Sequence, residues 1–177
     1  MDENFESLLQ QSIIEYLLPK GVIDTPLPDC PDVQEKWQSI AEEYLTDGIK
    51  EFQQYPVASL GWPMMIGMAV AKFWDDEWEI YSQIPNLYIY LKNKRGFDQM
   101  DEYIMEKVLF LNPEQTNKVT QLASDCAAHV LAFMRRQNIE PGTTDAFKAY
   151  VSCIHEMYLA GMAIQLKHMG YKMTATF

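Results

Sequence analysis

The chain has 177 residues, 48% of them hydrophobic, and a formal net charge of −11. A chain of this length can bury a sizeable core without disulfides or metals, so we expect a single all-α domain over residues 1–177. The acidity disfavours contact with phosphate backbones and with anionic lipid surfaces. We therefore expect neither a nucleic-acid nor a membrane partner.

The cysteines indicate a reducing compartment. Cys30, Cys126 and Cys153 are odd in number, and no two of them form a C-x-x-C pair. A disulfide framework and a cysteine zinc site are both disfavoured by this pattern. The acidic start at Met1–Asn4 lacks the basic and apolar regions of a signal peptide. These features predict a cytoplasmic protein.

The first third of the chain predicts two amphipathic helices joined by a connector. Residues 5–18 place apolar side chains on one helical face, and residues 33–52 do the same with an acidic outer face. Residues 19–31 contain four prolines, which exclude a regular element. We expect this Pro-rich connector to cross the surface, either as a plain crossover or as a lid.

The next helix, about residues 60–82, is apolar on every face between Trp62 and Trp74. Such a helix is normally surrounded by other helices. A membrane span is the alternative, because residues 52–71 carry no charge. The strongly apolar part is shorter than the roughly 20 residues that a span needs, and no basic flank orients it. A buried helix is therefore favoured.

The remaining elements follow in order. Residues 85–95 fit either a short helix or an extended segment, and residues 98–111 form an amphipathic helix. Asn112-Pro113, with Gln115 at the capping-box position, opens a long helix to about Asn138. Thr143 or Thr144 begins the last helix, to about residue 169, and residues 171–177 form a frayed tail. Small side chains in this last helix would let a neighbouring backbone approach closely: Ala149, Cys153, Ala160 and Ala163.

These elements predict an all-α fold, a six- to seven-helix bundle with two largely apolar central helices at about 60–82 and 144–169. Each central helix carries one charge that burial does not explain, Lys72 and Glu156. A lone buried carboxylate is costly, so Glu156 must be paired, protonated or near water. Lys72 can reach Asp75 or Asp76 on its own helix, or it could pair with Glu156 and fix how the two helices dock. Glu156 could instead be an acid or base in a pocket, or one or both residues could reach solvent.

Other candidate polar groups carry weaker signals. Cys126 and His129 are i, i+3 neighbours and could form a nucleophile pair, although a core thiol beside a core histidine fits equally. No H-E-x-x-H motif is present, so we expect no metal site and no cofactor. Metal-dependent hydrolysis would require at least three of six side chains to converge: His129, His155, His168, Asp75, Asp76 and Glu156.

No phosphate-binding loop, dinucleotide fingerprint or G-x-S-x-G motif occurs, so standard nucleotide-dependent and serine-hydrolase chemistry loses its support. The many aromatic and Met residues favour a non-enzymatic module that binds a protein partner or forms a homo-oligomer. The alternative is a small-molecule-binding domain or enzyme with an internal pocket. Its polar floor would be Glu156 with a histidine, and its lining would be Trp62, Met65, Met68, Trp74, Tyr158 and Met162.

Overall fold

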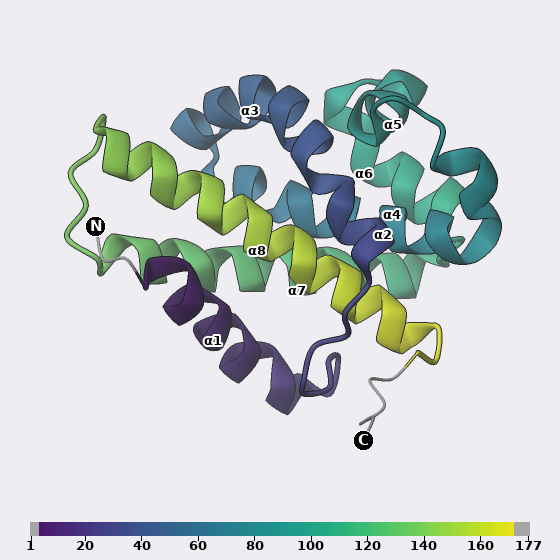
Figure 1. The fold of residues 1–177 in the computed structure, drawn as a ribbon, viewed down its shortest axis with the longest axis horizontal. Helices are drawn as coiled ribbons and strands as arrows, with labels where there is room; N and C mark the ends of the chain where they lie inside the picture. The colour runs from purple at the N-terminus through teal and green to yellow at the C-terminus, as the bar shows by residue number, and fades with distance from the viewer. Residues whose placement is uncertain (1–3, 172–177) are drawn as a thin grey trace.

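The computed structural model describes residues 4–171, and within that range the regular structure is entirely helical (Figure 1). This confirms the predicted all-α bundle; residues 172–177 of the predicted frayed tail lie outside the described range. The long helices are α1 (Phe5–Leu17), α3 (Trp37–Gln54), α4 (Pro56–Tyr81), α5 (Leu87–Arg95), α7 (Pro113–Arg135) and α8 (Thr144–His168). Shorter elements are α2 (Pro31–Glu35), α6 (Met100–Tyr103), the 3₁₀ turns η1 (Leu18–Lys20) and η2 (Phe97–Gln99), and a π-helical turn, η3 (Ile104–Val108).

The two predicted central helices, α4 and α8, form the core of the bundle. Their mutual contact is the most extensive between any two elements described, and α4 also packs against α7. Residues 59–71 and 156–166 are buried without interruption. α4 is long and apolar enough to cross a membrane by length and composition, but 78% of its most apolar window is buried inside the protein. A core helix passes the same test of length and hydropathy.

Two glycines set how closely α4 and α8 approach. A Cβ atom built on Gly67 would clash with the Tyr158 carbonyl oxygen, and one built on Gly161 would clash with the Met64 carbonyl oxygen. The two backbones are therefore in direct contact across the helix pair. The last helix was predicted to have a neighbour whose backbone approaches closely, and that neighbour is α4, with the contact at Gly161 and Gly67.

α4 begins at Pro56, earlier than the predicted start near residue 60, so Pro63 lies inside the helix. Proline has no N–H, so the Ser59 carbonyl loses its usual intrahelical donor. The Tyr44 hydroxyl of α3 donates to this oxygen at 2.6 Å. The helix continues through Pro63 with the orphaned carbonyl hydrogen-bonded, which explains why the proline does not mark the helix start.

Capping residues define several other helix ends. Asn86 accepts from the Ile89 N–H at the start of α5, and Gly96 with φ 87° ends it, so residues 87–95 are helical rather than extended. The Asn112–Gln115 capping box and the Thr143 cap are both present as predicted. The predicted helices at 33–52 and 98–111 are each divided, the first at Lys36 and the second into α6 and η3.

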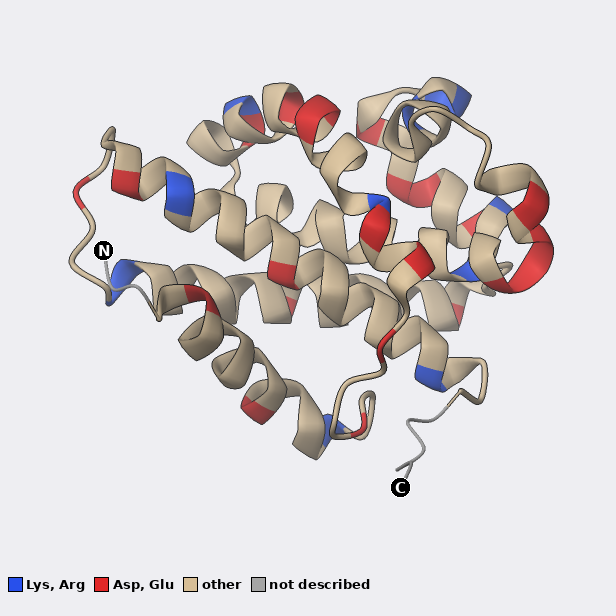
Figure 2. Ribbon diagram, in the orientation of Figure 1, with Lys and Arg blue, Asp and Glu red and all other residues tan. Residues whose placement is uncertain are grey.

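The outer helices enclose the central pair. α1 packs against α7 and α8, α3 packs against α4, and the connector after η1 runs from the end of α1 to α2 (Figure 1). Acidic residues gather at the C-terminal end of α4, whereas the middle parts of α4 and α8 are almost without charge (Figure 2). Glu156 is an exception within the buried stretch of α8.

Candidate functional site

Lys72 and Glu156, the two charges in the central helices, have different partners. The Lys72 ammonium lies 2.6 Å from Asp76 Oδ1, one turn further along α4. Glu156 is only 5% exposed, and its Oε1 accepts a hydrogen bond of 3.1 Å from the Gln10 amide of α1. The predicted ion pair between α4 and α8 is not present, and Glu156 instead faces α1.

Glu156 belongs to a polar cluster between α1 and α8, formed by Glu6, Gln10, His155 and Glu156. Glu6 and Gln10 lie one turn apart on α1. His155 Nδ1 lies 2.9 Å from Glu6 Oε1 and 3.8 Å from Glu156 Oε2. The imidazole also stacks on Trp37, with ring centroids 5.8 Å apart. Two helices far apart in sequence thus bring two carboxyl groups and an imidazole together.

Burial and a like charge alter the acidity of this cluster. Burial, followed by the charge of Glu6, raises the pKa of Glu156 to about 8, and the Gln10 hydrogen bond only partly opposes this rise. Within residues 4–171, no Lys or Arg is ion-paired with Glu6 or Glu156. Glu156 therefore holds a proton at neutral pH, which removes most of the cost of burying a carboxylate.

The same cluster is where a divalent cation could be held. Glu6, His155 and Glu156 each offer one ligand atom, and these atoms lie within 4.8 Å of one another. Carboxylate and imidazole are ordinary ligands of zinc and related ions. The sequence showed no such grouping, because Glu6 is remote in the chain and His155 and Glu156 are adjacent.

The predicted Cys126–His129 pair has other partners. Cys126 lies 3.8 Å from the Met157 sulfur, and burial raises the pKa of its thiol to about 12. His129 Nε2 is 2.9 Å from the Ser12 hydroxyl, and its ring stacks on Tyr16. A thiol held in its neutral form makes a poor nucleophile. The geometry matches the core interpretation of this pair.

The acidic candidates at the end of α4 lie apart from the polar cluster. Asp75 accepts from the Tyr171 hydroxyl, and Asp76 pairs with Lys72. Both aspartates are exposed. They belong to the charged surface end of α4 and contribute nothing to the surroundings of Glu156.

The six predicted pocket-lining residues do not share one pocket. Trp62 and Met65 line a recess of about 360 Å³, and Met162 lines a second of about 340 Å³ that also includes Gln10. Tyr158 is fully buried and donates to the Val33 carbonyl, while Trp74 donates to Asp32. Met68 alone among the six lines a third hollow, between α7 and α8.

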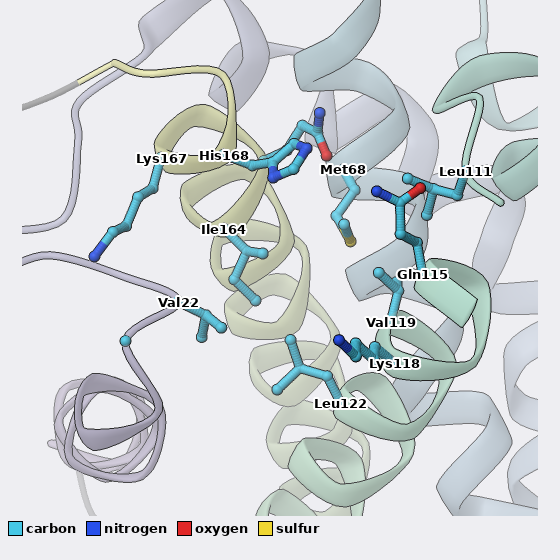
Figure 3. Close-up of a pocket in the computed structure, with 12 residues that line it drawn as sticks. Val22, Met68, Leu111, Gln115, Lys118, Val119, Leu122, Ile164, Lys167 and His168 are labelled. Atoms are coloured by element: carbon cyan, nitrogen blue, oxygen red, sulfur yellow. The ribbon is translucent and has the colours of Figure 1, made fainter. Parts of the chain in front are cut away.

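That hollow, the α7–α8 groove, has a volume of about 530 Å³ (Figure 3). It lies between α7 and α8, with α4 behind it and the segment after η1 at one side. Its apolar lining consists of Val22, Met68, Leu111, Val119, Leu122 and Ile164. Its polar lining consists of Gln115, Lys118, Gln165, Lys167 and His168, with Gly21 completing the wall.

Gln165 is the most unusual lining residue. It is 4% exposed, and its side chain makes no hydrogen bond to any other residue in the described part of the chain. No buried side-chain nitrogen or oxygen atom among the described residues lacks a hydrogen-bond partner, so the Gln165 amide is open to the solvent in the groove, where water or a bound polar group can pair with it. Sequence reasoning missed Gln165, since it searched the last helix for formal charges. An uncharged amide within an otherwise apolar run was the available signal.

Several large apolar side chains are exposed on the described part of the chain. They come from several elements: Leu8, Leu18, Tyr55, Ile80, Phe110, Phe147 and Tyr171. Single exposed hydrophobic residues are normal on protein surfaces. The predicted protein partner or homo-oligomer therefore stays a prediction.

Comparisons of the chain with models of protein families, with curated proteins and with solved structures found no match. The polar cluster and the α7–α8 groove are the features of the structure that bear on function.

Proposed function

We propose that this protein binds a small, mostly apolar molecule in the α7–α8 groove. The observation that carries the proposal is the groove itself, with a volume of about 530 Å³, six apolar lining side chains and the solvent-open amide of Gln165. Ligand sites typically have volumes of about 300–1,000 Å³ and combine an apolar lining with a few polar groups. The groove has these properties.

The helices that form the groove give it a rigid frame. Its floor includes Met68 of the buried stretch of α4 and Ile164 of the buried stretch of α8. Val119 and Leu122, one helical turn apart on α7, form the opposite wall and are half-buried. Covering this apolar surface with a ligand would contribute about 25 cal/mol for each Å² removed from water.

A fluorescence titration with Nile red, an uncharged apolar dye, tests the proposal. We expect saturable binding to the native protein and a loss of at least about tenfold in affinity in Val119→Trp, since the indole would fill the groove. The matched control is Ile89→Trp, which enlarges a half-buried aliphatic residue on α5, outside the groove. Equal dye binding by both variants would place the dye elsewhere and overturn the proposal.

A further inference from the structure

The α7–α8 groove differs in charge from the protein that contains it. The chain has 25 Asp and Glu residues against 14 Lys and Arg. Among residues 4–171, no Asp or Glu lines the groove, whereas Lys118, Lys167 and His168 do. A ligand entering the groove therefore meets cationic or neutral polar groups at its walls, in a molecule whose surface is otherwise acidic.

The three basic residues are not equally available to a ligand. Lys167 is bonded to Asp24 at 2.9 Å, and Figure 3 shows its side chain directed away from Met68 and Gln115. Lys118 lies 3.6 Å from Glu114, in a pair in which both side chains are more than three-quarters exposed. Such an exposed i, i+4 pair contributes little energy. Lys118 can therefore turn towards a ligand at small cost, whereas Lys167 is already neutralised.

Two polar side chains, Gln115 and His168, lie at one end of the groove, whereas Lys118 lies beside Leu122 toward the other end (Figure 3). Gln115 and His168 face each other across Met68, and Val22 and Leu122 lie toward the other end (Figure 3). Gln165 lies one helical turn or less from His168 on α8, so it belongs to the polar end. The Gln165 amide offers two N–H donors, makes no hydrogen bond to another described residue, and is open to the solvent in the groove. The two amides and the imidazole thus gather at one end of the groove, and the Lys118 side chain lies on its wall nearer the other end (Figure 3).

We propose that the natural occupant is an amphipathic anion, a carboxylate with an apolar chain, oriented with its head at Gln115, Gln165 and His168. This inference rests on the proposed function and names its ligand class. The carboxylate oxygens accept from the two amides, and the exposed Lys118 on the wall beside Leu122 adds positive charge that favours an anion in the groove. The chain covers Val22, Leu122 and Ile164. A cationic head group would find no carboxylate among the described lining residues, and the positive charge of Lys118 would repel it.

Isothermal titration with decanoate, decanol and decylamine tests the head group, because the three share one apolar chain. Only the binding that Val119→Trp abolishes is counted, which removes association of the amine with the acidic surface. We expect decanoate to bind at least about tenfold more tightly than decanol, and decylamine to bind most weakly. Charge-assisted hydrogen bonds from the amides account for the difference.

Each outcome of this titration has a distinct meaning. Equal affinity for decanoate and decanol would overturn the anionic head while leaving the proposed function intact. Preference for decylamine would also overturn it. If no compound binds and Nile red also fails to bind, the groove is not a ligand site, and both proposals fall.

Two substitutions test the assigned head-group residues. Gln165→Met keeps the side-chain length and removes the donors, so it should abolish the preference for decanoate over decanol while decanol binding persists. Lys118→Gln, at an exposed position, should weaken decanoate binding by about threefold to tenfold. Lys107→Gln, at another exposed lysine outside the groove, is its control and should have no effect. Unchanged decanoate preference in both Gln165→Met and Lys118→Gln would overturn the inference.

Discussion

At the scale of single residues, the burial of Glu156 is the largest local departure from an apolar core. Its side chain is 5% exposed, and its titratable neighbours are a second carboxyl group, Glu6, and the imidazole of His155. A single hydrogen bond from Gln10 does not offset the loss of hydration of a full negative charge. The proton held by Glu156 is therefore part of what allows α1 to dock on α8.

We expect the stability of the native protein to decrease with pH because of Glu156. Its pKa is raised from 4.5 to about 8 on folding, so between these values the folded protein holds a proton that the unfolded chain has released. This contribution is fully present below about pH 4.5 and is lost as the pH rises to about 8, at about 1.4 kcal/mol per pH unit. Urea unfolding between these pH values measures the slope.

Glu156→Gln should remove this contribution to the slope, because the amide is neutral at every pH in the range. The variant should be more stable than the native protein at pH 8 by up to about 5 kcal/mol, which is the slope of about 1.4 kcal/mol per pH unit summed from pH 4.5 to about 8. Glu15→Gln changes an exposed carboxyl on α1 and is the control. Parallel pH profiles for the native protein and Glu156→Gln would show that Glu156 is ionised at neutral pH.

At the scale of single residues, the sequence could indicate that burying Glu156 is costly, but not which residues surround it. The apolar surroundings of Glu156 predicted that it must be paired, protonated or near water. Its actual partners, Glu6 and Gln10, lie about 150 residues away in the chain. Lys72 was considered as a partner of Glu156 because helical patterns show which face a residue occupies, but not which helix covers that face.

At the scale of elements, the α4–α8 contact depends on two residues without side chains. Gly161 faces the Met64 carbonyl of α4, and Gly67 faces the Tyr158 carbonyl of α8. Backbone cannot move aside as a flexible side chain can, so an added methyl group must push the two helices apart. Since these helices form the centre of the bundle, their separation would disturb the packing of several elements at once.

We expect Gly161→Ala to lower the free energy of unfolding by about 3 kcal/mol or more, through overpacking between two backbones. Gly61→Ala is a matched control in α4, because its new Cβ would lie 3.7 Å from the nearest atom, the Ala123 carbonyl oxygen. That substitution should be neutral or stabilising by up to about 1 kcal/mol, as alanine favours the helix. Chemical denaturation of both variants compares them directly, and equal losses of stability would contradict the close approach.

Helices could be predicted from the sequence wherever neighbouring residues alone determine them, through hydrophobic periodicity or a capping residue. Hydrophobic periodicity located α1, α3 and α7, and the Asn112–Gln115 box and Thr143 marked two helix starts. The start of α4 was predicted too late, near residue 60, because a proline such as Pro63 usually lies in the first turn of a helix. The Tyr44 hydroxyl that accommodates this proline comes from another helix, so the local pattern contains no sign of it.

At the scale of the whole molecule, charge and burial are separated. The apolar parts of α4 and α8 fill the centre, and the excess of acidic over basic residues lies around them (Figure 2). The separation follows from composition and helical periodicity, and both were readable from the sequence. The α7–α8 groove was not, because its lining residues range from Gly21 to His168 and meet only when the bundle is assembled.

The net charge of −11 makes the salt dependence of stability a test at this scale. Self-repulsion among surface carboxylates opposes the compact state, and raising the ionic strength from about 0.01 M to about 0.15 M shortens the screening length from roughly 30 Å to roughly 8 Å. We expect Tm at pH 7 to rise by about 2–4 °C, equivalent to roughly 1 kcal/mol for a chain of this length.

At about pH 4.6, the calculated isoelectric point, the repulsion is absent and the same salt should leave Tm unchanged or lower it by screening pairs such as Lys92–Asp47. Thermal unfolding followed by circular dichroism at both pH values measures the difference. A fall in Tm at pH 7 would mean that attractive pairs outweigh the repulsion, so that the acidic surface has no net electrostatic cost for the fold.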